Sequence, residues 1–317
     1  MPFFDDPAIF RSVLENLPVG IYILDRERRV HFWNRGAEHI TGYLGHEVVG
    51  QACSGPLQHC DAQGRILCAD RCPVTATFHD GHPQQSFVFS LHKQGHRVGM
   101  QVRTLPIFES RDQVAGVAVV FQDASANCGT ESFGSLMYGC LDPITGVPSQ
   151  RLTRAALAES VIGLEERHGG FGLLRIRVLG LKEFSAKHGA NSVVPFLRAT
   201  AQTIRHSLGG EDFVGRWDEH EFLAVLHSPS PVTVAAMAET IGRLLSQSEN
   251  SWWGDRFLIE AVVAHAIARP GDQLETLIGT LNSDHAARQA PDPCEVKVLC
   301  SQSSGSSSCS VPSSPAI

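Results

Sequence analysis

Four cysteines stand within twenty positions of one another, at Cys53, Cys60, Cys68 and Cys72, and His59 precedes the second of them. Thiolate and imidazole groups are the donors that Zn²⁺ and iron–sulfur clusters prefer. The whole chain has 9 cysteines. Without an export signal, closely spaced cysteines are more typical of ligands or redox groups than of disulfides. The cluster therefore predicts a zinc or iron–sulfur site built from these five residues.

The spacing of the cluster leaves a second interpretation open. The intervals between the cysteines differ from the two CxxC knuckles of a standard zinc ribbon. Small thiol side chains also pack well in apolar surroundings without binding anything. Metal ligation and simple packing are therefore both retained, and a redox sensor based on a bound metal or cluster is one function that the sequence allows.

The composition is that of an ordinary globular protein. The chain has 317 residues, 43% of them hydrophobic, which is enough for about two domains. Its net charge is -7, and nucleic-acid binding needs a surplus of Lys and Arg, so no nucleic-acid partner is expected. The apolar run Val114–Phe121 is far shorter than the roughly 20 residues that cross a bilayer, and the amino terminus starts acidic. We expect a cytoplasmic protein without a membrane partner.

The first half of the chain has the pattern of a sheet with helices inserted into it. Asp6-Pro7 is a favourable helix start, because a carboxylate caps the first turn and proline loses nothing there. Turn residues separate the five β-rich runs that follow. These runs are Ile21–Leu24, Val30–Trp33, Ser86–Leu91, Arg97–Pro106 and Val114–Phe121. An antiparallel sheet of about five strands, with helices between the second and third, is the expected assembly.

The second half alternates between helical and strand-like patterns, which predicts an α/β or α+β domain with a central sheet. The expected helices are Arg151–Arg167, Val193–Leu208, Val232–Ser246 and Leu274–Arg288. The expected strands are Phe171–Leu179, Phe213–Trp217, Glu221–Leu226 and Phe257–Ile267. A glycine-containing linker at 126–140 divides the halves, and the Ser-rich tail at 291–317 is expected to be disordered.

The stretch from Phe10 to Ser125 resembles a PAS sensory domain. The resemblance rests on Asn34 after the second strand, on the helix-like Ala37–Tyr43 and on the closing strand Val117–Asp123. It implies a cupped antiparallel sheet, an α+β fold, over residues 1–125. Such domains hold a small ligand or cofactor, or serve as dimerisation and relay units.

Two other cofactors are less favoured for this domain. The segment around Cys53 is similar to that of flavin-binding LOV domains, but Ala52 and Ser54 replace the Asn and Arg that such domains have there. His79 follows a short helical run and could hold haem, although a single histidine near a helix end is more often a surface group. We expect His92 and His96, which flank a turn, to face solvent.

From Leu141 onward the chain resembles a GGDEF domain, the diguanylate cyclase module that condenses two GTP molecules into cyclic di-GMP. The opening Leu141–Pro148 follows the start of that family. The signature position, after Arg216-Trp217, reads Asp218-Glu219-His220-Glu221-Phe222. The resemblance implies a nucleotide cyclase-like α/β domain over residues 141–290.

The metal ligands of the family are altered in this chain. An ungapped alignment puts Arg177 at the position of one metal-binding Asp and His220 at the acidic third position of the signature. A guanidinium is a permanent cation, and imidazole is a poor donor for Mg²⁺. Glu221 alone is retained, so Mg²⁺ is expected only if the cyclase is active after all.

The nucleotide-binding positions are altered as well. The guanosine-recognising residues of the family fall at Ser185, Ala186 and Val194, and the two signature glycines are replaced by Asp218 and Glu219. The two carboxylates repel phosphate, and they occupy the place where glycines allow close approach. The feedback site of the family keeps its Asp at Asp212 but has Gly209 in place of Arg.

These observations lead to one main hypothesis and two alternatives. The main hypothesis is a signalling protein with a PAS sensor and a degenerate, non-catalytic GGDEF domain that acts as a regulatory module. The alternatives are an active diguanylate cyclase and the cysteine-ligated metal or iron–sulfur redox sensor. Both modules commonly pair, so a homodimer with signalling protein partners is expected by analogy.

Overall fold

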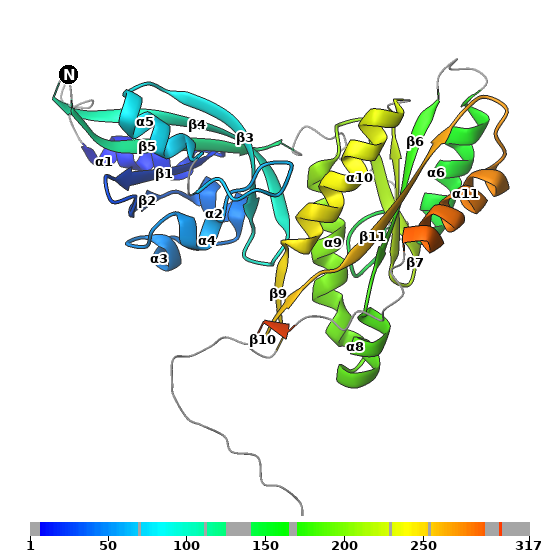
Figure 1. Ribbon diagram of the computed structural model, residues 1–317. Helices are drawn as coiled ribbons and strands as arrows, with labels where there is room; N and C mark the ends of the chain where they lie inside the picture. Colours follow the sequence, from blue (N-terminus) through cyan, green and yellow to red (C-terminus); the bar gives the residue numbers. More distant parts are fainter. Residues whose placement is uncertain are drawn as a thin grey trace, which may run out of the picture.

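The computed structural model describes residues 7–68, 71–110, 113–124, 141–164, 170–227, 230–252, 255–288 and 298–299. Within them the chain forms two lobes side by side (Figure 1). The predicted linker at 126–140 lies outside the described residues, and so does the predicted tail at 291–317 except for β12 (Val298–Leu299). Among the described helices, none has the length and apolar character needed to span a membrane.

A five-stranded antiparallel sheet forms the first lobe, in the order β2-β1-β5-β4-β3. Its strands are β1 (Gly20–Asp25), β2 (Val30–Trp33), β3 (Gln84–Leu91), β4 (Arg97–Ser110) and β5 (Gln113–Asp123). All five predicted strands are confirmed, and β4 and β5 extend further because they pair over a long hairpin. Within this lobe the first and last strands in sequence, β1 and β5, are neighbours in the sheet, and β2 and β3 form its two edges.

Short helices cover this sheet and connect β2 to β3. They are α1 (Pro7–Asn16), α2 (Arg35–Thr41), α3 (Gly45–Val48), α4 (Ser54–Leu57) and α5 (Pro73–Asp80). Asn34 fixes the start of α2, because its Oδ1 accepts hydrogen bonds from the backbone N–H groups of Ala37 and Ile21, both at 2.8 Å. Its amide nitrogen donates to the carbonyl of Leu14 at 2.9 Å, which ties α1 to the same point.

Aromatic side chains fill the interior of the first lobe. The rings of Tyr22 and Trp33 lie 5.5 Å apart, and that of Phe121 lies 5.8 Å from Tyr22. Aromatic pairs at such separations stabilise a core beyond the area that they bury. The Tyr22 hydroxyl is buried there and has no hydrogen-bond partner in the described part of the chain, and burial raises the pKa of Tyr22 well above its usual value.

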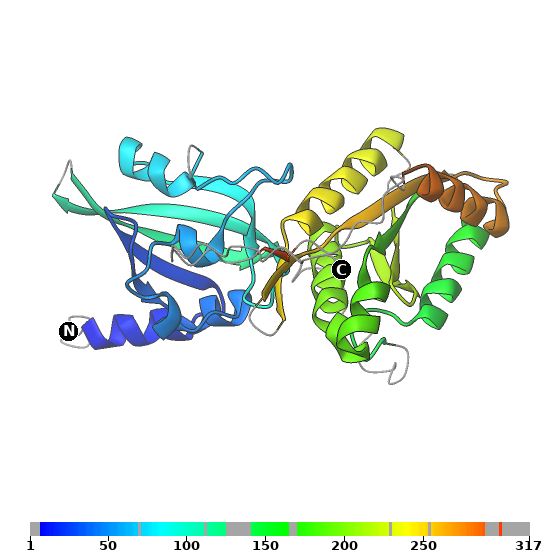
Figure 2. The same ribbon diagram turned by 60° about the horizontal axis from the view of Figure 1, so that its bottom comes forward.

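The second lobe has a four-stranded antiparallel sheet in the order β11-β6-β8-β7, with helices on both faces (Figure 2). The strands are β6 (Phe171–Val178), β7 (Phe213–Asp218), β8 (Glu221–Leu226) and β11 (Ala261–Ala268). The helices are α6 (Gln150–Ile162), α8 (Leu181–His188), α9 (Val194–Ser207), α10 (Pro231–Ser246) and α11 (Leu274–Arg288), with a 3₁₀ turn at Ala190–Val193. Helices α9 and α10 pack on Leu174 and Ile176 of β6, whereas α6 and α11 pack on the face that carries Leu173. Strand β6 is therefore covered on both faces.

The structure corrects two expectations about this lobe. The predicted strand Phe257–Ile267 is two strands, because β10 (Asp255–Leu258) pairs with β9 (Glu249–Trp252) in a separate small sheet. The strand pattern is interrupted at Ile259-Glu260, where the carbonyl of Glu260 accepts a hydrogen bond from the N–H of Leu179 at 2.8 Å. Helix α8 was not anticipated. It begins directly after Gly180, whose φ of 71° is one that glycine adopts without strain.

The two lobes pack against each other through α9 and α10 on one side and β3 and β4 on the other (Figures 1 and 2). Cys60, Phe89 and Leu244 form a buried apolar cluster at this boundary. A Cβ atom at Gly99 would lie 2.8 Å from the carbonyl oxygen of His206, so glycine permits this close approach. The expectation that His96 faces solvent is wrong, since α9 covers it and leaves it 5% exposed.

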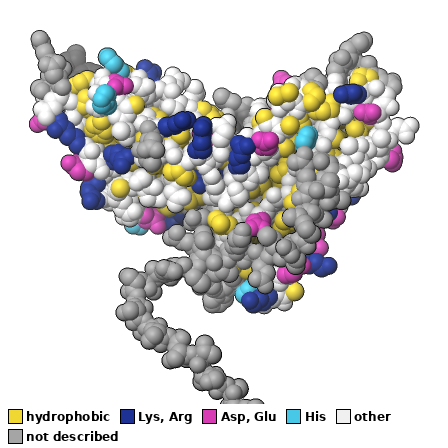
Figure 3. All heavy atoms as spheres, viewed as in Figure 1, with side chains coloured by type: hydrophobic (Ala, Val, Ile, Leu, Met, Phe, Trp, Pro, Cys, Tyr) yellow, Lys and Arg dark blue, Asp and Glu magenta, His cyan; other side chains and the backbone are white. Residues whose placement is uncertain are grey.

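The boundary is also held by Arg97, which is 1% exposed. Its guanidinium donates to the carbonyl of Gln58 at 2.7 Å within the first lobe and to that of Gln247 at 3.1 Å in the second. The backbone N–H of Arg97 donates to Thr203 Oγ1 at 3.1 Å. One residue of β4 thus bonds to two separate segments of the second lobe. On the face shown in Figure 3, acidic and basic side chains are interspersed over both lobes.

Candidate functional site

Glu221, the glutamate of the signature segment, is buried at the start of a strand. Glu221 is the first residue of β8, is 5% exposed and lies directly opposite Arg177 of β6 in the register of the sheet. Since side chains alternate along a strand, Arg175 shares a face of β6 with Arg177. The fold thus brings two guanidinium groups to one carboxylate.

Both oxygens of Glu221 are engaged by these cations. Arg175 donates from Nε to Oε2 at 2.7 Å, and Arg177 forms an ion pair with Oε1. Arg175 also donates to the side chain of Asn282 on α11, so its guanidinium is fixed from two sides. A buried carboxylate with this number of charge-assisted hydrogen bonds is locked into one geometry.

The turn before Glu221 contains the three altered positions of the signature, Asp218, Glu219 and His220. Asp218 and Glu219 are exposed, and the N–H of Glu219 donates to Asp218 Oδ1 at 2.9 Å. The described non-glycine residues with positive φ are Arg28 and Gln58, so this turn forms without the backbone conformation that glycine would supply. Burial lowers the pKa of His220, which favours the neutral imidazole.

The opening segment of the domain supports the turn from behind. Asp142 Oδ1 accepts from the N–H and the hydroxyl of Thr145 at 2.8 and 2.7 Å. The other carboxylate oxygen of Asp142 lies 3.9 Å from Nε of Arg216, the buried residue that precedes the signature. Arg216 in turn donates to the carbonyl of Glu219 and stacks over Phe222. The retained family residues therefore hold the backbone of the turn.

A cavity of about 510 Å³ lies in front of this turn. It is lined by residues 177–183 and 218–221, which include the retained Glu221 and the four altered catalytic positions Arg177, Asp218, Glu219 and His220. The three altered nucleotide positions do not line it: Ser185 and Ala186 lie further along α8, and Val194 is the half-buried first residue of α9. The structure thus gathers the predicted catalytic positions and separates them from the predicted nucleotide positions.

The residues at this cavity do not fit Mg²⁺. This ion needs near-octahedral oxygen ligands, usually including one or two carboxylates. Both oxygens of Glu221 are bound by guanidinium groups, and Arg177 stands where a ligand would have to be. Asp218 and Glu219 are exposed on the turn, and His220 offers only imidazole nitrogen.

The predicted cysteine site is divided between two environments. Cys53 and Cys72 pack in the apolar core of the first lobe, whereas Cys60 packs against Phe89 and Leu244 at the lobe boundary. Burial raises the pKa of Cys53 to about 12 and also raises the pKa values of Cys60 and Cys68, which favours neutral thiols.

The remaining predicted ligand of that site is also buried. His59 is 8% exposed, and burial lowers its pKa to about 4. Across the described part of the chain, no three His, Cys, Asp or Glu side chains are grouped so that they could hold a metal ion. The zinc or iron–sulfur site stays a prediction, and metal and sulfide analysis of the purified protein tests it.

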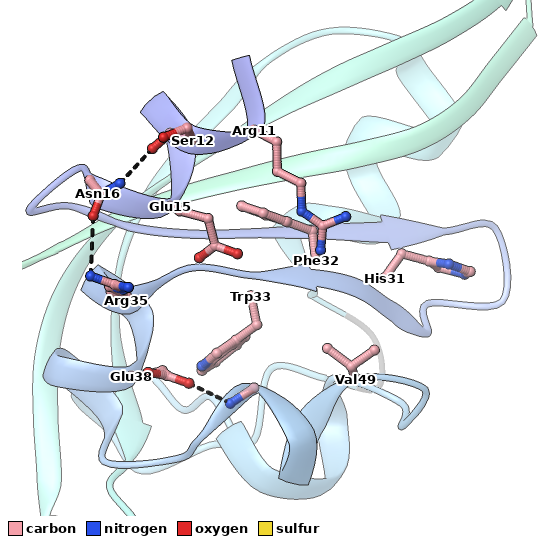
Figure 4. A pocket seen from close by; sticks show the side chains of 11 residues that line it. Arg11, Ser12, Glu15, Asn16, His31, Phe32, Trp33, Arg35, Glu38 and Val49 are labelled. Carbon is pink, nitrogen blue, oxygen red and sulfur yellow. Dashed lines mark hydrogen bonds between the residues drawn. The ribbon is translucent and has the colours of Figure 1, made fainter. Parts of the chain in front are cut away.

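The first lobe has a cavity of about 550 Å³ outside its aromatic interior (Figure 4). Side chains of α1 and β2 line it, with Arg11 and Glu15 directed across it (Figure 4). Its wall is ordered by polar contacts, including the N–H of Gly45 donating to Glu38 Oε1 at 2.7 Å.

His79, the residue considered for haem, has an 86% exposed side chain that contacts Asp80 at 2.6 Å.

Sequence reasoning missed the residues that complete the ion-pair network. Arg175 was not singled out, although two arginines spaced by two in an otherwise apolar strand must share a face. That alternation is a usable signal for a buried acidic partner, since buried charges are paired. Asn282 gave no comparable signal, because only the packing of α11 on β6 brings it there.

Comparisons with known proteins agree with this architecture. A family model described as the PAS fold matches residues 8–124, and one described as the diguanylate cyclase GGDEF domain matches residues 140–291. A stretch of 119 residues is 28% identical to the signal transduction histidine-protein kinase AtoS of Escherichia coli, covering 38% of this chain and 18% of the kinase. The chain thus spans less than a fifth of that relative.

Two solved structures with GGDEF domains match about half of this chain. The GGDEF domain of DgcB from Caulobacter crescentus, in complex with c-di-GMP, is 16% identical, with a TM-score of 0.46 over 50% of this chain and 96% of that one. The diguanylate cyclase SiaD from Pseudomonas aeruginosa, in complex with its activator SiaC, is 19% identical, with a TM-score of 0.45 over 47% of this chain and 58% of that one. On the family matches, the chain consists of a PAS domain followed by a GGDEF domain and belongs to these two families.

Proposed function

We propose that this protein is a regulatory signalling protein whose PAS domain senses and whose GGDEF domain acts without forming cyclic di-GMP. The observation that carries this proposal is the pairing of Glu221 with both Arg175 and Arg177. Two fixed cations take the place of the divalent metal at the one retained carboxylate of the site.

Charge explains why this arrangement opposes catalysis. Phosphoryl-type transfer from GTP depends on metal ions that neutralise the triphosphate. A divalent ion would have to displace guanidinium groups that cannot lose their charge and that are held at hydrogen-bond distance in a buried site. Asp218 and Glu219 line the same cavity, and their carboxylates repel the phosphates of GTP when no metal ion screens them.

The guanosine side supports the same conclusion independently. Val194 begins α9 at the position that reads the base in the family, and a valine side chain accepts no hydrogen bond. Ser185 and Ala186 lie outside the cavity at the turn. The domain then serves through its surfaces, as a module for protein partners.

The test is an assay for product with the full-length protein. GTP is added with Mg²⁺ or Mn²⁺, and chromatography follows cyclic di-GMP, with an intact GGDEF enzyme as the positive control. We expect no product with either metal. Sustained turnover that disappears in Glu221→Gln would overturn the proposal in favour of an active diguanylate cyclase.

Within the same proposal the signalling unit is a homodimer. Helix α1 has no buried residue, and Phe10 and Val13 are 53% and 56% exposed on it. Pairing of two copies through this helix would remove these side chains from water. Light scattering on the wild type and on Phe10→Glu measures the mass, and we expect a dimer and a monomer respectively.

A further inference from the structure

Three histidine rings are stacked across the boundary between the PAS and GGDEF domains. The rings of His92 and His96, from the turn between β3 and β4, have centroids 4.1 Å apart at an interplanar angle of 21°. The ring of His206, on α9 of the other domain, lies 5.8 Å from that of His96 and is nearly parallel to it, at 13°. The stack therefore crosses from one domain to the other.

The surroundings of His92 and His96 favour neutral rings. The backbone N–H of Gln94 donates to Nδ1 of His92 at 3.0 Å, so that nitrogen carries no proton. Nδ1 of His96 is buried without a hydrogen-bond partner among the described residues. Burial lowers the pKa of His92 to about 4 and that of His96 to about 2, and the neighbouring rings contribute to both shifts.

The charged groups around the stack come from five elements. Arg198 of α9 lines the same cavity as His92, and so does the ion pair between Lys93 of the turn and Glu47 of α3. As sequence neighbours, Arg97 follows His96 on β4 and Arg205 precedes His206 on α9. From β5, Asp123 approaches Nδ1 of His206 at 3.3 Å. Asp123 favours protonation of His96, whereas burial and the two neighbouring imidazoles oppose it more strongly.

Protons can reach the stack from solvent. A cavity of about 600 Å³ is lined by both domains, with His92 and Lys93 on one side and Pro195 and Arg198 on the other. His92 is half-buried at this cavity, and His96 lies behind it. Protonation of His92 would break its bond from Gln94 and place a cation 4.1 Å from the next ring.

We propose that the stacked imidazoles of His92 and His96, packed against His206 of α9, form an acid-sensitive latch that holds the PAS and GGDEF domains together when His92 and His96 are neutral and releases them when they are protonated. The proposal does not depend on whether the GGDEF domain is catalytic. It concerns how the two domains are coupled.

The direction and size of the effect follow from linkage. When the domains separate, the exposed rings regain an ordinary pKa of about 6.5 and bind protons more readily than in the docked state. Below that pH, each such ring weakens the docking equilibrium by up to about tenfold per pH unit. For His92 and His96 together the equilibrium constant falls by up to about one hundredfold per unit until pH approaches 4.

Small-angle X-ray scattering of the full-length protein tests the latch. The radius of gyration is measured at pH 7.5 and pH 5.0, with circular dichroism at both values to show that the domains stay folded. We expect the wild type to expand at pH 5.0. The double variant His92→Phe/His96→Phe keeps aromatic rings that cannot be protonated, and we expect it to remain compact at both pH values.

The controls separate the latch from other titrations. His79→Gln alters an exposed histidine away from the boundary and should expand as the wild type does. His96→Arg places a fixed cation in the stack and should be expanded already at pH 7.5. A wild type that stays compact while folded, or a phenylalanine variant that opens at the same pH, would overturn the proposal. If the phenylalanine variant is open at pH 7.5, the pair His92→Asn/His96→Asn replaces it with the same two outcomes.

Discussion

The signature turn and the domain boundary both bury ionisable groups, but they satisfy them in opposite ways. At the turn, Glu221 is matched by the guanidinium groups of Arg175 and Arg177. At the boundary, the guanidinium of Arg97 is bonded to backbone carbonyls and the imidazoles of His92 and His96 are neutral. Paired charges of fixed sign resist pH, whereas neutral buried imidazoles do not. The first arrangement suits a permanent framework and the second a junction that responds.

The largest effect is expected at the signature turn. Glu221→Gln removes the carboxylate between two guanidinium groups, and breaking a buried ion pair from one side costs about 4 kcal/mol. Urea unfolding measures the free energy of unfolding. Glu219→Gln, on the same turn but exposed, is the matched control and should leave stability unchanged.

The direction of that result distinguishes a framework from a metal site. Carboxylates gathered to bind a cation repel one another when the cation is absent, so removing one of them stabilises the protein. A Glu221→Gln variant as stable as the wild type, or more stable, would contradict the view that the arginines have replaced the metal.

A slightly smaller effect is expected at the boundary. Arg97→Met leaves the carbonyls of Gln58 and Gln247 without their charged donor, at a cost of about 3 kcal/mol. We expect the single unfolding transition of the wild type to separate into two, because the link between the domains is weakened. Arg103→Met, on the exposed face of the same strand, should keep one transition.

The pH dependence of stability sharpens the comparison further. His59 and His96 have lowered pKa values in the folded protein, of about 4 and about 2, so the unfolded chain binds more protons. Stability is therefore greatest above about pH 6.5 and falls as the pH decreases. Between pH 6.5 and 5.5 each of these two rings contributes a loss of about 1 kcal/mol.

Urea titrations at these two pH values measure that loss. His59→Gln should retain the contribution of His96 and lose its own, which gives a shallower dependence on pH. A wild type with equal stability at both values would show that the buried imidazoles are compensated by other groups.

The smallest effect is expected for an ion pair on the surface. Lys93 and Glu47 are 2.6 Å apart, but their side chains are 43% and 32% exposed, and water and salt screen such pairs. Lys93→Met should leave the unfolding midpoint unchanged within error at moderate ionic strength. A clear shift would mean that the neighbouring stack depends on this charge.

Local patterns were sufficient to predict the strands of both sheets. Alternating and continuous apolar runs identified β1 to β5 and the central strands of the second domain, because strand burial leaves a direct trace in composition. The interruption at Ile259-Glu260 left no such trace, since Phe257-Leu258 before it and β11 after it are apolar and only their different partner strands divide them. Helix α8 has only eight residues and follows a glycine, so its apolar periodicity is too short to predict a helix.

The candidate site was predicted in part for comparable reasons. Arg177 and Glu221, which the alignment singled out, line one cavity because they lie opposite each other on adjacent strands. The burial of His96 could not be read from its own segment, where a turn with glycine is typical of an exposed loop. Only the arrival of α9 from more than a hundred residues away converts that turn into an interior.

Gly99 and Arg97 together limit how this protein can be divided. A cut in the segment between the domains would expose Leu244 and the carbonyl of Gln247 on one product, and Phe89 and the Arg97 guanidinium on the other. Each separated domain would then expose the surface that packs against the other domain, including Gly99, which contacts the backbone at His206. The PAS domain therefore cannot be exchanged independently of the GGDEF domain: a different sensor domain in this chain would require matching changes on α9 and α10.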